Sequence, residues 1–156
     1  MSTEVRATND LPIVCDPTPL TEAQKQHWID EIAPKLYKAV QEIQELPDGY
    51  AWRLPSEPEI LMLLAEDLNF ERLCCPFLRY TLEIEPNHGA FWLRMTGSEG
   101  VKDFLRLTYE STNLFDLKVA QAAGFDMSAG KDMNSVETVM EAIDTINEQF
   151  AQTSRS

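Results

Sequence analysis

The chain has 156 residues, of which 44% are apolar, and 26 acidic against 13 basic residues give a formal net charge of −13. This length predicts one globular domain, and the excess of carboxylates disfavours binding to phosphate backbones or anionic lipid surfaces. No apolar run approaches the roughly 20 residues of a membrane-spanning helix, and the N-terminal segment MSTEVRATNDLP lacks the apolar core of a signal peptide. We therefore expect a cytoplasmic protein whose partners include neither nucleic acid nor a membrane.

The N-terminal part predicts an arm followed by a helix. Residues 1–10 are polar and without periodicity, so we expect them to be disordered. Two prolines exclude regular helix immediately after Cys15, which places this cysteine on an arm. Thr21 begins a capping box, and apolar residues recur at helical spacing as far as Leu46. One helix, bent at Pro34, is therefore predicted.

A turn, a strand and a second helix are predicted next. The sequence Pro-Asp-Gly at 47–49 favours a turn, and the alternation over 50–54 favours a short strand. A second capping box at Ser56 and Glu59 predicts a helix that runs to about Cys74. The first half of this helix is apolar on most sides, so we expect other elements to cover it on more than one face.

The next segment predicts a hairpin. Apolar and polar residues alternate over 78–85 and again over 91–96, with an Asn-His-Gly loop at 87–89 between them. A third helix is expected from about Val101. The chain thus predicts an α+β fold, with a small antiparallel sheet of about three strands and helices on one face.

Two further helices are predicted in the C-terminal part. The first ends at Gly124, and the second starts near Asn134, which fits a cap together with Glu137. We expect an α+β domain over 11–110 and a C-terminal helical extension over 111–156 packed on the same domain. The final helix either packs back on the sheet or pairs with a second copy or another protein.

The densest group of unusual residues is the segment FERLCCPF at 70–77. On a helix, Glu71 lies three and four residues before Cys74 and Cys75, so its carboxylate can approach both thiols. Three thiols converge if the arm carrying Cys15 folds beside this turn. Soft ions such as Hg(II), As(III), Cu(I) and Zn(II) prefer such sulfur sites. The candidate metal site therefore comprises Cys15, Cys74 and Cys75 as ligands, with Glu71 as an acceptor that orients the thiols.

A structural role for the cysteines is the competing interpretation. Cysteine is often buried as a small apolar residue, and periodicity does not separate packing from binding. Three cysteines, two of them adjacent, disfavour a disulfide framework and favour free thiols in a reducing compartment. His27 and His88 are isolated, and no Cys-x-x-Cys spacing exists, so a closed zinc site is not expected.

The catalytic templates give no support for an enzyme. The sequence has no glycine-rich phosphate loop, no Gly-x-Ser-x-Gly elbow and no His-Glu-x-x-His. A nucleophilic Cys74 or Cys75 requires a depressed thiol pKa, whereas the dipole at the C-terminal end of a helix disfavours a thiolate. Aromatic residues on the predicted strands fit either the core or an aromatic ligand pocket; these are Tyr50, Trp52, Phe91 and Trp92.

Three segments also carry a resemblance: ERLCCPFLRY at 71–80, WLRMTG at 92–97 and GVKDFL at 100–105. The chain resembles a group of small uncharacterised bacterial proteins built around Glu-Arg-x-Cys-Cys-Pro-Phe, with an upstream cysteine that matches Cys15. A similar segment occurs at the C-terminal ends of some mercury-resistance-type transcription regulators. The resemblance implies that the three cysteines act together on a soft metal or metalloid. The chain lacks the basic winged DNA-binding segment of those regulators, and its helices after Leu105 have no counterpart in the group.

Two functional hypotheses follow from the sequence. The first is a cytoplasmic binder of a soft metal or metalloid ion, with no other cofactor. The second is a non-enzymatic protein–protein interaction module, in which the cysteines are structural and the C-terminal helices contact a partner.

Overall fold

The computed structural model describes residues 11–154, so the predicted disorder of residues 1–10 lies outside the described part. The elements in chain order are α1 (Glu22–His27), a π-helical turn η2 (Trp28–Ile32), α2 (Ala33–Ala39), β1 (Glu42–Leu46), β2 (Gly49–Leu54), α3 (Pro58–Cys74), β3 (Arg79–Ile84), β4 (Phe91–Thr96), α4 (Val101–Ser111), α5 (Leu117–Ala122) and α6 (Val136–Ser154).

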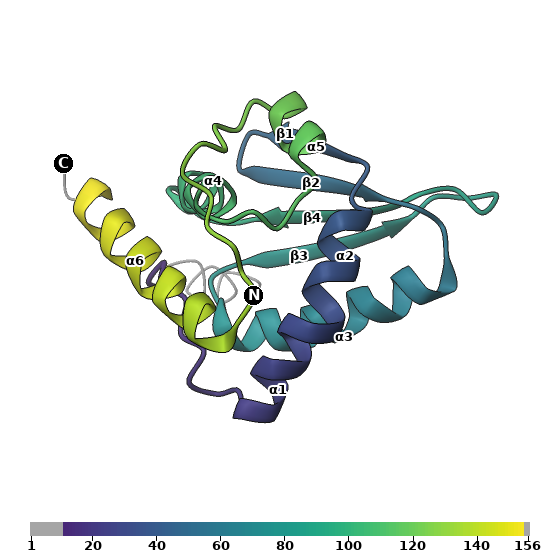
Figure 1. The fold of residues 1–156 in the computed structure, drawn as a ribbon. Coiled ribbons are helices and arrows are strands. Elements are labelled where there is room, and N and C mark those ends of the chain that lie inside the picture. Colours follow the sequence, from purple (N-terminus) through teal and green to yellow (C-terminus); the bar gives the residue numbers. More distant parts are fainter. Residues whose placement is uncertain (1–10, 155–156) are drawn as a thin grey trace, which may run out of the picture.

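The sheet is four-stranded and antiparallel, with the order β1-β2-β4-β3 (Figure 1). Burial alternates along β4, where Phe91, Leu93 and Met95 turn inward, and Leu93 lies opposite the buried Trp52 of β2. On the other face of the same strands, Arg53 is exposed. The predicted α+β class and the antiparallel sheet are confirmed, while the expectation of about three strands falls short by β1.

The strand β1 replaces the end of the first predicted helix. That helix stops at Ala39, and β1 pairs with β2 across a two-residue loop. Ile43 is buried opposite Trp52 in this pairing. An apolar residue at this position fits the stripe of a helix and also the inner face of a strand. Pairing with β2 makes this segment a strand, and local periodicity gives no information about that pairing.

The first helical segment is irregular near Pro34, where a bend is predicted. The backbone N–H of Ala33 bonds to Trp28 O, five residues back, which forms the π-helical turn η2. Pro34 then lies in the first turn of α2, where its missing N–H costs little. The capping box at Thr21 is confirmed, because its hydroxyl accepts from Gln24 N while the Gln24 side chain accepts from Thr21 N.

Two other predicted caps are wrong. The N-cap of α3 is Glu57 and makes no side-chain capping bond, because Pro58 at the first helical position provides the start. At the start of α6, the hydroxyl of Ser135, and not Asn134, accepts a hydrogen bond from Thr138 N at 3.1 Å. Both helices nevertheless occupy the segments that their apolar periodicity predicts.

The helices surround the inner face of the sheet (Figure 1). Helix α2 packs against α3, and α4 packs against β2. The two C-terminal helices make their main contacts with different elements, α5 with β1 and α6 with α4. The apolar stripe of α6 is turned inward, with Val139, Ala142 and Ile146 buried and Phe150 against Phe104 at 5.3 Å between ring centroids.

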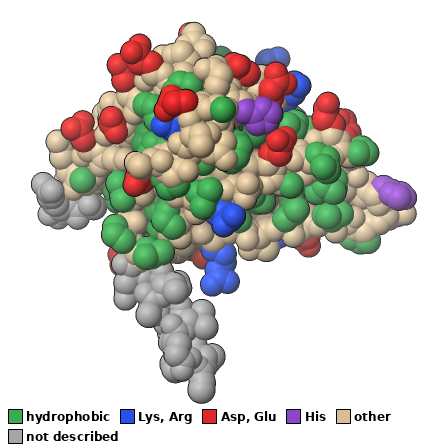
Figure 2. Space-filling model, turned by 90° about the horizontal axis from the view of Figure 1, so that it is seen from below, with side chains coloured by type: hydrophobic (Ala, Val, Ile, Leu, Met, Phe, Trp, Pro, Cys, Tyr) green, Lys and Arg blue, Asp and Glu red, His purple; other side chains and the backbone are tan. Residues whose placement is uncertain are grey.

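The face seen in Figure 2 carries apolar side chains between acidic ones. Helix α3 is less covered than its sequence predicts, because Met62 in its first half is 67% exposed. In the edge strand β3, Ile84 is 55% exposed. Within residues 11–154, no helix has the length and apolar character needed to cross a membrane.

Candidate functional site

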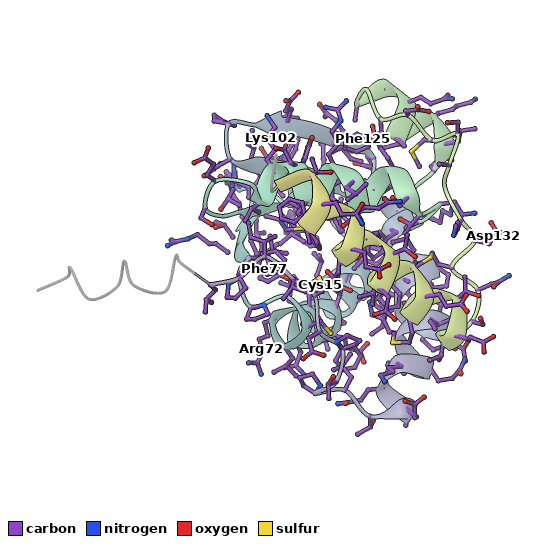
Figure 3. All side chains as sticks on the ribbon, turned by 90° about the vertical axis from the view of Figure 1, so that its left-hand side faces the viewer. Cys15, Arg72, Phe77, Lys102, Phe125 and Asp132 are labelled. Carbon is purple, nitrogen blue, oxygen red and sulfur yellow. A yellow bond between two sulfur atoms is a disulfide. The ribbon has the colours of Figure 1, made fainter. Side chains whose placement is uncertain are left out.

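The N-terminal arm docks against the end of α3. The N–H of Asp16 donates to the carbonyl of Cys74 at 2.8 Å. The side chain of Asn147 in α6 holds both backbone groups of the preceding residue: it accepts from Cys15 N at 3.1 Å and donates to Cys15 O at 2.8 Å. Cys15 thus lies between α6 and the C-terminal end of α3 (Figure 3). These bonds hold the arm beside the paired cysteines.

Cys15 and Cys75 form a disulfide, with their Cα atoms 4.8 Å apart and a separation of 60 positions in sequence. The expectation of free thiols is therefore wrong for these two cysteines. The count of three cysteines excludes a framework of several bridges, but it does not exclude one bridge and one free thiol. The docked arm brings Cys15 to the turn after α3, within the distance that a disulfide requires.

Cys74 is the remaining free cysteine, and its side chain is half-buried. Burial, together with the smaller effects of the nearby carboxylates of Glu71, Asp16 and Asp67, raises the pKa of its thiol to about 12. A thiol with this pKa is protonated at neutral pH and is a poor nucleophile. Cys74 therefore does not have the depressed pKa that a thiol-dependent enzyme requires.

A cavity of about 140 Å³ is lined by residues of the sheet, of α3, α4 and α6, of the N-terminal arm and of the first helical segment, which contributes Lys25. Its walls are mostly apolar, and they include Cys15, Cys74, Cys75 and Glu71. The structure thus brings all four predicted site residues to one cavity. In the described part of the chain, no group of three or more His, Cys, Asp or Glu side chains is arranged to hold a metal ion while the disulfide is closed.

Two carboxylates from successive turns of α3 line the cavity. Asp67 is 1% exposed and accepts a hydrogen bond from Trp28 Nε1 at 2.8 Å. Glu71 accepts one from Tyr37 Oη at 3.0 Å. Burial raises the pKa of both carboxyl groups, and the charge of Glu71 raises that of Asp67 further, whereas each hydrogen bond acts in the opposite direction. The neutral acid is thereby favoured in this pair as long as no cation lies beside it.

The raised pKa of Asp67 predicts a pH-dependent stability. Above its ordinary value of 3.8, the folded protein binds more protons at this site than the unfolded chain. The free energy of unfolding should therefore fall as the pH rises toward the folded-state pKa, by at most about 1.4 kcal/mol per pH unit for one proton. Replacing Asp67 by Asn should remove this contribution.

Urea denaturation of the wild type and of Asp67→Asn over a pH series measures the difference. Asp103→Asn, at an exposed position on α4, is the matched control and should follow the wild type. If Asp67→Asn and the wild type change in parallel with pH, Asp67 does not titrate with a raised pKa.

Two polar atoms at the cavity walls have no hydrogen-bond partner. Trp52 is 1% exposed, and its Nε1 makes no hydrogen bond of normal geometry; the buried hydroxyl of Tyr80 makes none either. Both residues line the cavity. Buried polar groups are usually satisfied, so each of these atoms calls for an explanation.

The other candidates lie away from this cavity. His27 contacts Glu66 at 3.0 Å on the surface, and His88 occupies the β3–β4 hairpin with a φ of 59°. Of the four aromatic residues considered for a pocket, only Trp52 lines this cavity. Tyr50 and Phe91 belong to the core.

Sequence reasoning missed Asp67, Asn147 and the two unpartnered groups. Asp67 had a signal, because it follows Ile60 and Leu63 at helical spacing and so falls on the apolar stripe of α3. Asn147 likewise lies four residues after Ile143 on the stripe of α6. A polar residue at a core position predicts a buried hydrogen bond but does not name its partner.

No family model, curated protein or solved structure matched the chain. The fold and the site therefore rest on this chain's own geometry, and the resemblance to the Glu-Arg-x-Cys-Cys-Pro-Phe proteins stays a prediction.

Proposed function

We propose that the protein binds a thiophilic metal or metalloid ion through Cys15, Cys74 and Cys75 when its disulfide is reduced. One observation carries the proposal: three cysteines from two distant segments line a single cavity, with two of them already in bonding contact. A reduced pair held this closely lies within reach of one ion, and thiolates are the ligands that soft ions prefer.

Reduction controls access to the proposed site. Opening the disulfide takes two electrons and two protons, which two molecules of a thiol such as glutathione supply while they form their own disulfide. We place the protein in the cytoplasm, where such thiols keep cysteines reduced. In the oxidised form only Cys74 is left as a thiol, so the ion has at most one sulfur ligand.

Burial favours an ion whose thiolate complex is neutral. The high pKa of Cys74 reflects the cost of a thiolate charge at this site. Arsenious acid avoids that cost: As(OH)₃ and three thiols give As(S-Cys)₃ and three water molecules, with no net charge. Hg(II) reaches neutrality with two thiolates and releases two protons. As(III) is therefore the ion that we expect to engage all three cysteines.

Titration of the reduced protein with As(III) and Hg(II), with counting of the unreacted thiols, tests the proposal. We expect one As(III) per chain and protection of all three thiols. Replacing Cys74 by Ser should weaken As(III) binding by at least about tenfold, the scale on which loss of a supporting group acts at metal sites. The same variant should retain Hg(II), because Cys15 and Cys75 remain.

Controls separate the site from general thiol chemistry. The triple Cys→Ser variant should bind neither ion, and the oxidised wild type should not bind As(III) through three thiols. Unchanged As(III) affinity in the triple variant, or three thiols that stay reactive at saturating As(III), contradicts the proposal.

The interaction-module hypothesis draws less support. It requires an apolar surface on the C-terminal helices, whereas the residues of the α6 stripe are buried against the same chain. Leu117 of α5 is 56% exposed, but a single exposed apolar residue is normal on a protein surface.

A further inference from the structure

The carboxylates in the cavity accept fewer hydrogen bonds than they can. Asp67 and Glu71 each accept one bond from a neutral side chain, from Trp28 and Tyr37 respectively. An ionised carboxylate offers about four lone-pair positions. Among the described residues, no Lys, Arg or His side chain pairs with either carboxylate, and the ammonium group of Lys25, which also lines the cavity, pairs with Glu22 at 2.9 Å. This end of the cavity thus suits a group that brings several N–H donors.

The indole of Trp52 has the opposite requirement. Its Nε1–H is a donor only and lies at the cavity wall, and its contact with the hydroxyl of Tyr109 lacks normal hydrogen-bond geometry. Tyr37 connects the two regions, because its hydroxyl donates to Glu71 and its ring packs on Trp52 at 5.0 Å between centroids. Tyr37 therefore contacts both the carboxylate of Glu71 and the indole of Trp52.

The volume limits what the cavity can hold. At about 140 Å³ it is close to the roughly 150 Å³ apolar cavity that accommodates benzene. Its apolar walls favour a hydrocarbon body over a sugar or a phosphate.

We infer that the cavity is a binding site for a small organic ammonium ion with an apolar body and one hydrogen-bond-accepting atom. The ammonium group donates to Asp67 and Glu71, and the accepting atom receives the Nε1–H of Trp52. The hydroxyl of Tyr80 is a second donor for the same atom. This site shares its cavity and Glu71 with the proposed ion site, but it does not use the thiols and is present in the disulfide-bonded form.

Three probes with the same number of non-hydrogen atoms test the inference on the oxidised wild-type protein. 3-Methoxypropylamine carries both groups, n-pentylamine lacks the accepting oxygen, and 1-methoxybutane lacks the ammonium. Nitrogen-15 NMR follows the indole N–H of Trp52, assigned with Trp52→Phe. We expect 3-methoxypropylamine to shift this signal saturably and to bind at least about tenfold more tightly than either analogue, as expected for one lost hydrogen bond to a charged or buried group.

Two variants locate the contacts. Asp67→Asn should weaken the binding of 3-methoxypropylamine by at least about tenfold and leave the binding of 1-methoxybutane unchanged. Tyr80→Phe removes a hydroxyl without a partner in the fold, so it should leave the fold intact and reduce the preference for 3-methoxypropylamine over n-pentylamine. Asp103→Asn, on the exposed side of α4, should have no effect on any probe.

The inference is overturned if no probe shifts the Trp52 signal saturably, or if all three bind equally. Unchanged binding to Asp67→Asn or, should that variant not fold, an unchanged probe preference in Tyr80→Phe also overturns it. Because the probes are added to the oxidised protein, in which two thiols are bonded to each other, these outcomes are independent of As(III) binding by the reduced form.

Discussion

Reduction of the Cys15–Cys75 disulfide is expected to lower the free energy of unfolding by about 4 kcal/mol. The bridge joins residues 60 apart, and closing a loop of this length removes that much chain entropy from the unfolded state. The effect is large for a domain of this size, whose total stability is typically about 5–15 kcal/mol. The reduced protein should nevertheless remain folded, because hydrogen bonds from Asp16 and Asn147 still hold the arm.

Urea denaturation with and without a thiol reductant measures this effect. Cys15→Ser should match the reduced wild type and should not respond to the reductant, while Cys74→Ser should respond as the wild type does. Equal stability of the oxidised and reduced wild type contradicts a disulfide that constrains the chain.

Replacing Phe115 by Ala is expected to cost about 3–5 kcal/mol of unfolding free energy. Phe115 is 2% exposed although it lies in the segment between α4 and α5. Its ring packs against those of Tyr37, Trp52 and Tyr109, with 5.1–5.4 Å between ring centroids. Its removal leaves a cavity next to the aromatic cluster that forms part of the ligand cavity wall.

Leu117→Ala is the matched control, since Leu117 lies two residues away and is 56% exposed. We expect its stability to stay within about 0.5 kcal/mol of the wild type in the same urea titrations. A loss below about 1 kcal/mol for Phe115→Ala is incompatible with the packing described for this ring.

The elements with strict alternation or strong helical periodicity were predictable from the sequence. The strands β2, β3 and β4 and the helices α3, α4 and α6 lie where their patterns place them. Strand β1 was not predictable, because Ile43 fits the spacing of a helix and also that of a strand. Only its pairing with β2 distinguishes the two structures. The burial of Phe115 was not predictable either, because a single aromatic residue in a loop is not part of a periodic pattern that indicates burial.

The candidate site was predictable only in part. Glu71, Cys74 and Cys75 share one helix end, so their proximity follows from helix geometry. The approach of Cys15 depends on hydrogen bonds to Asn147, 132 residues away, which no local pattern contains. The disulfide was missed for the same reason, because bonding of two cysteines depends on tertiary distance and not on their number.

The disulfide and the raised thiol pKa together define when the proposed ion site exists. With the disulfide closed, Cys74 is protonated at neutral pH and has no thiol partner in the described structure. After reduction, three cysteines line an apolar cavity beside Glu71. The protein is then suited to an ion that exchanges water or hydroxide for sulfur without adding charge.

X-ray absorption spectroscopy at the arsenic edge, on the reduced protein loaded with one equivalent of As(III), shows directly which atoms surround the ion. We expect three sulfur neighbours and no oxygen neighbour, and in Cys74→Ser two sulfurs and one oxygen. Arsenic that keeps its oxygen neighbours in the wild type, or that has the same surroundings in the wild type and the triple Cys→Ser variant, contradicts a single site built from Cys15, Cys74 and Cys75.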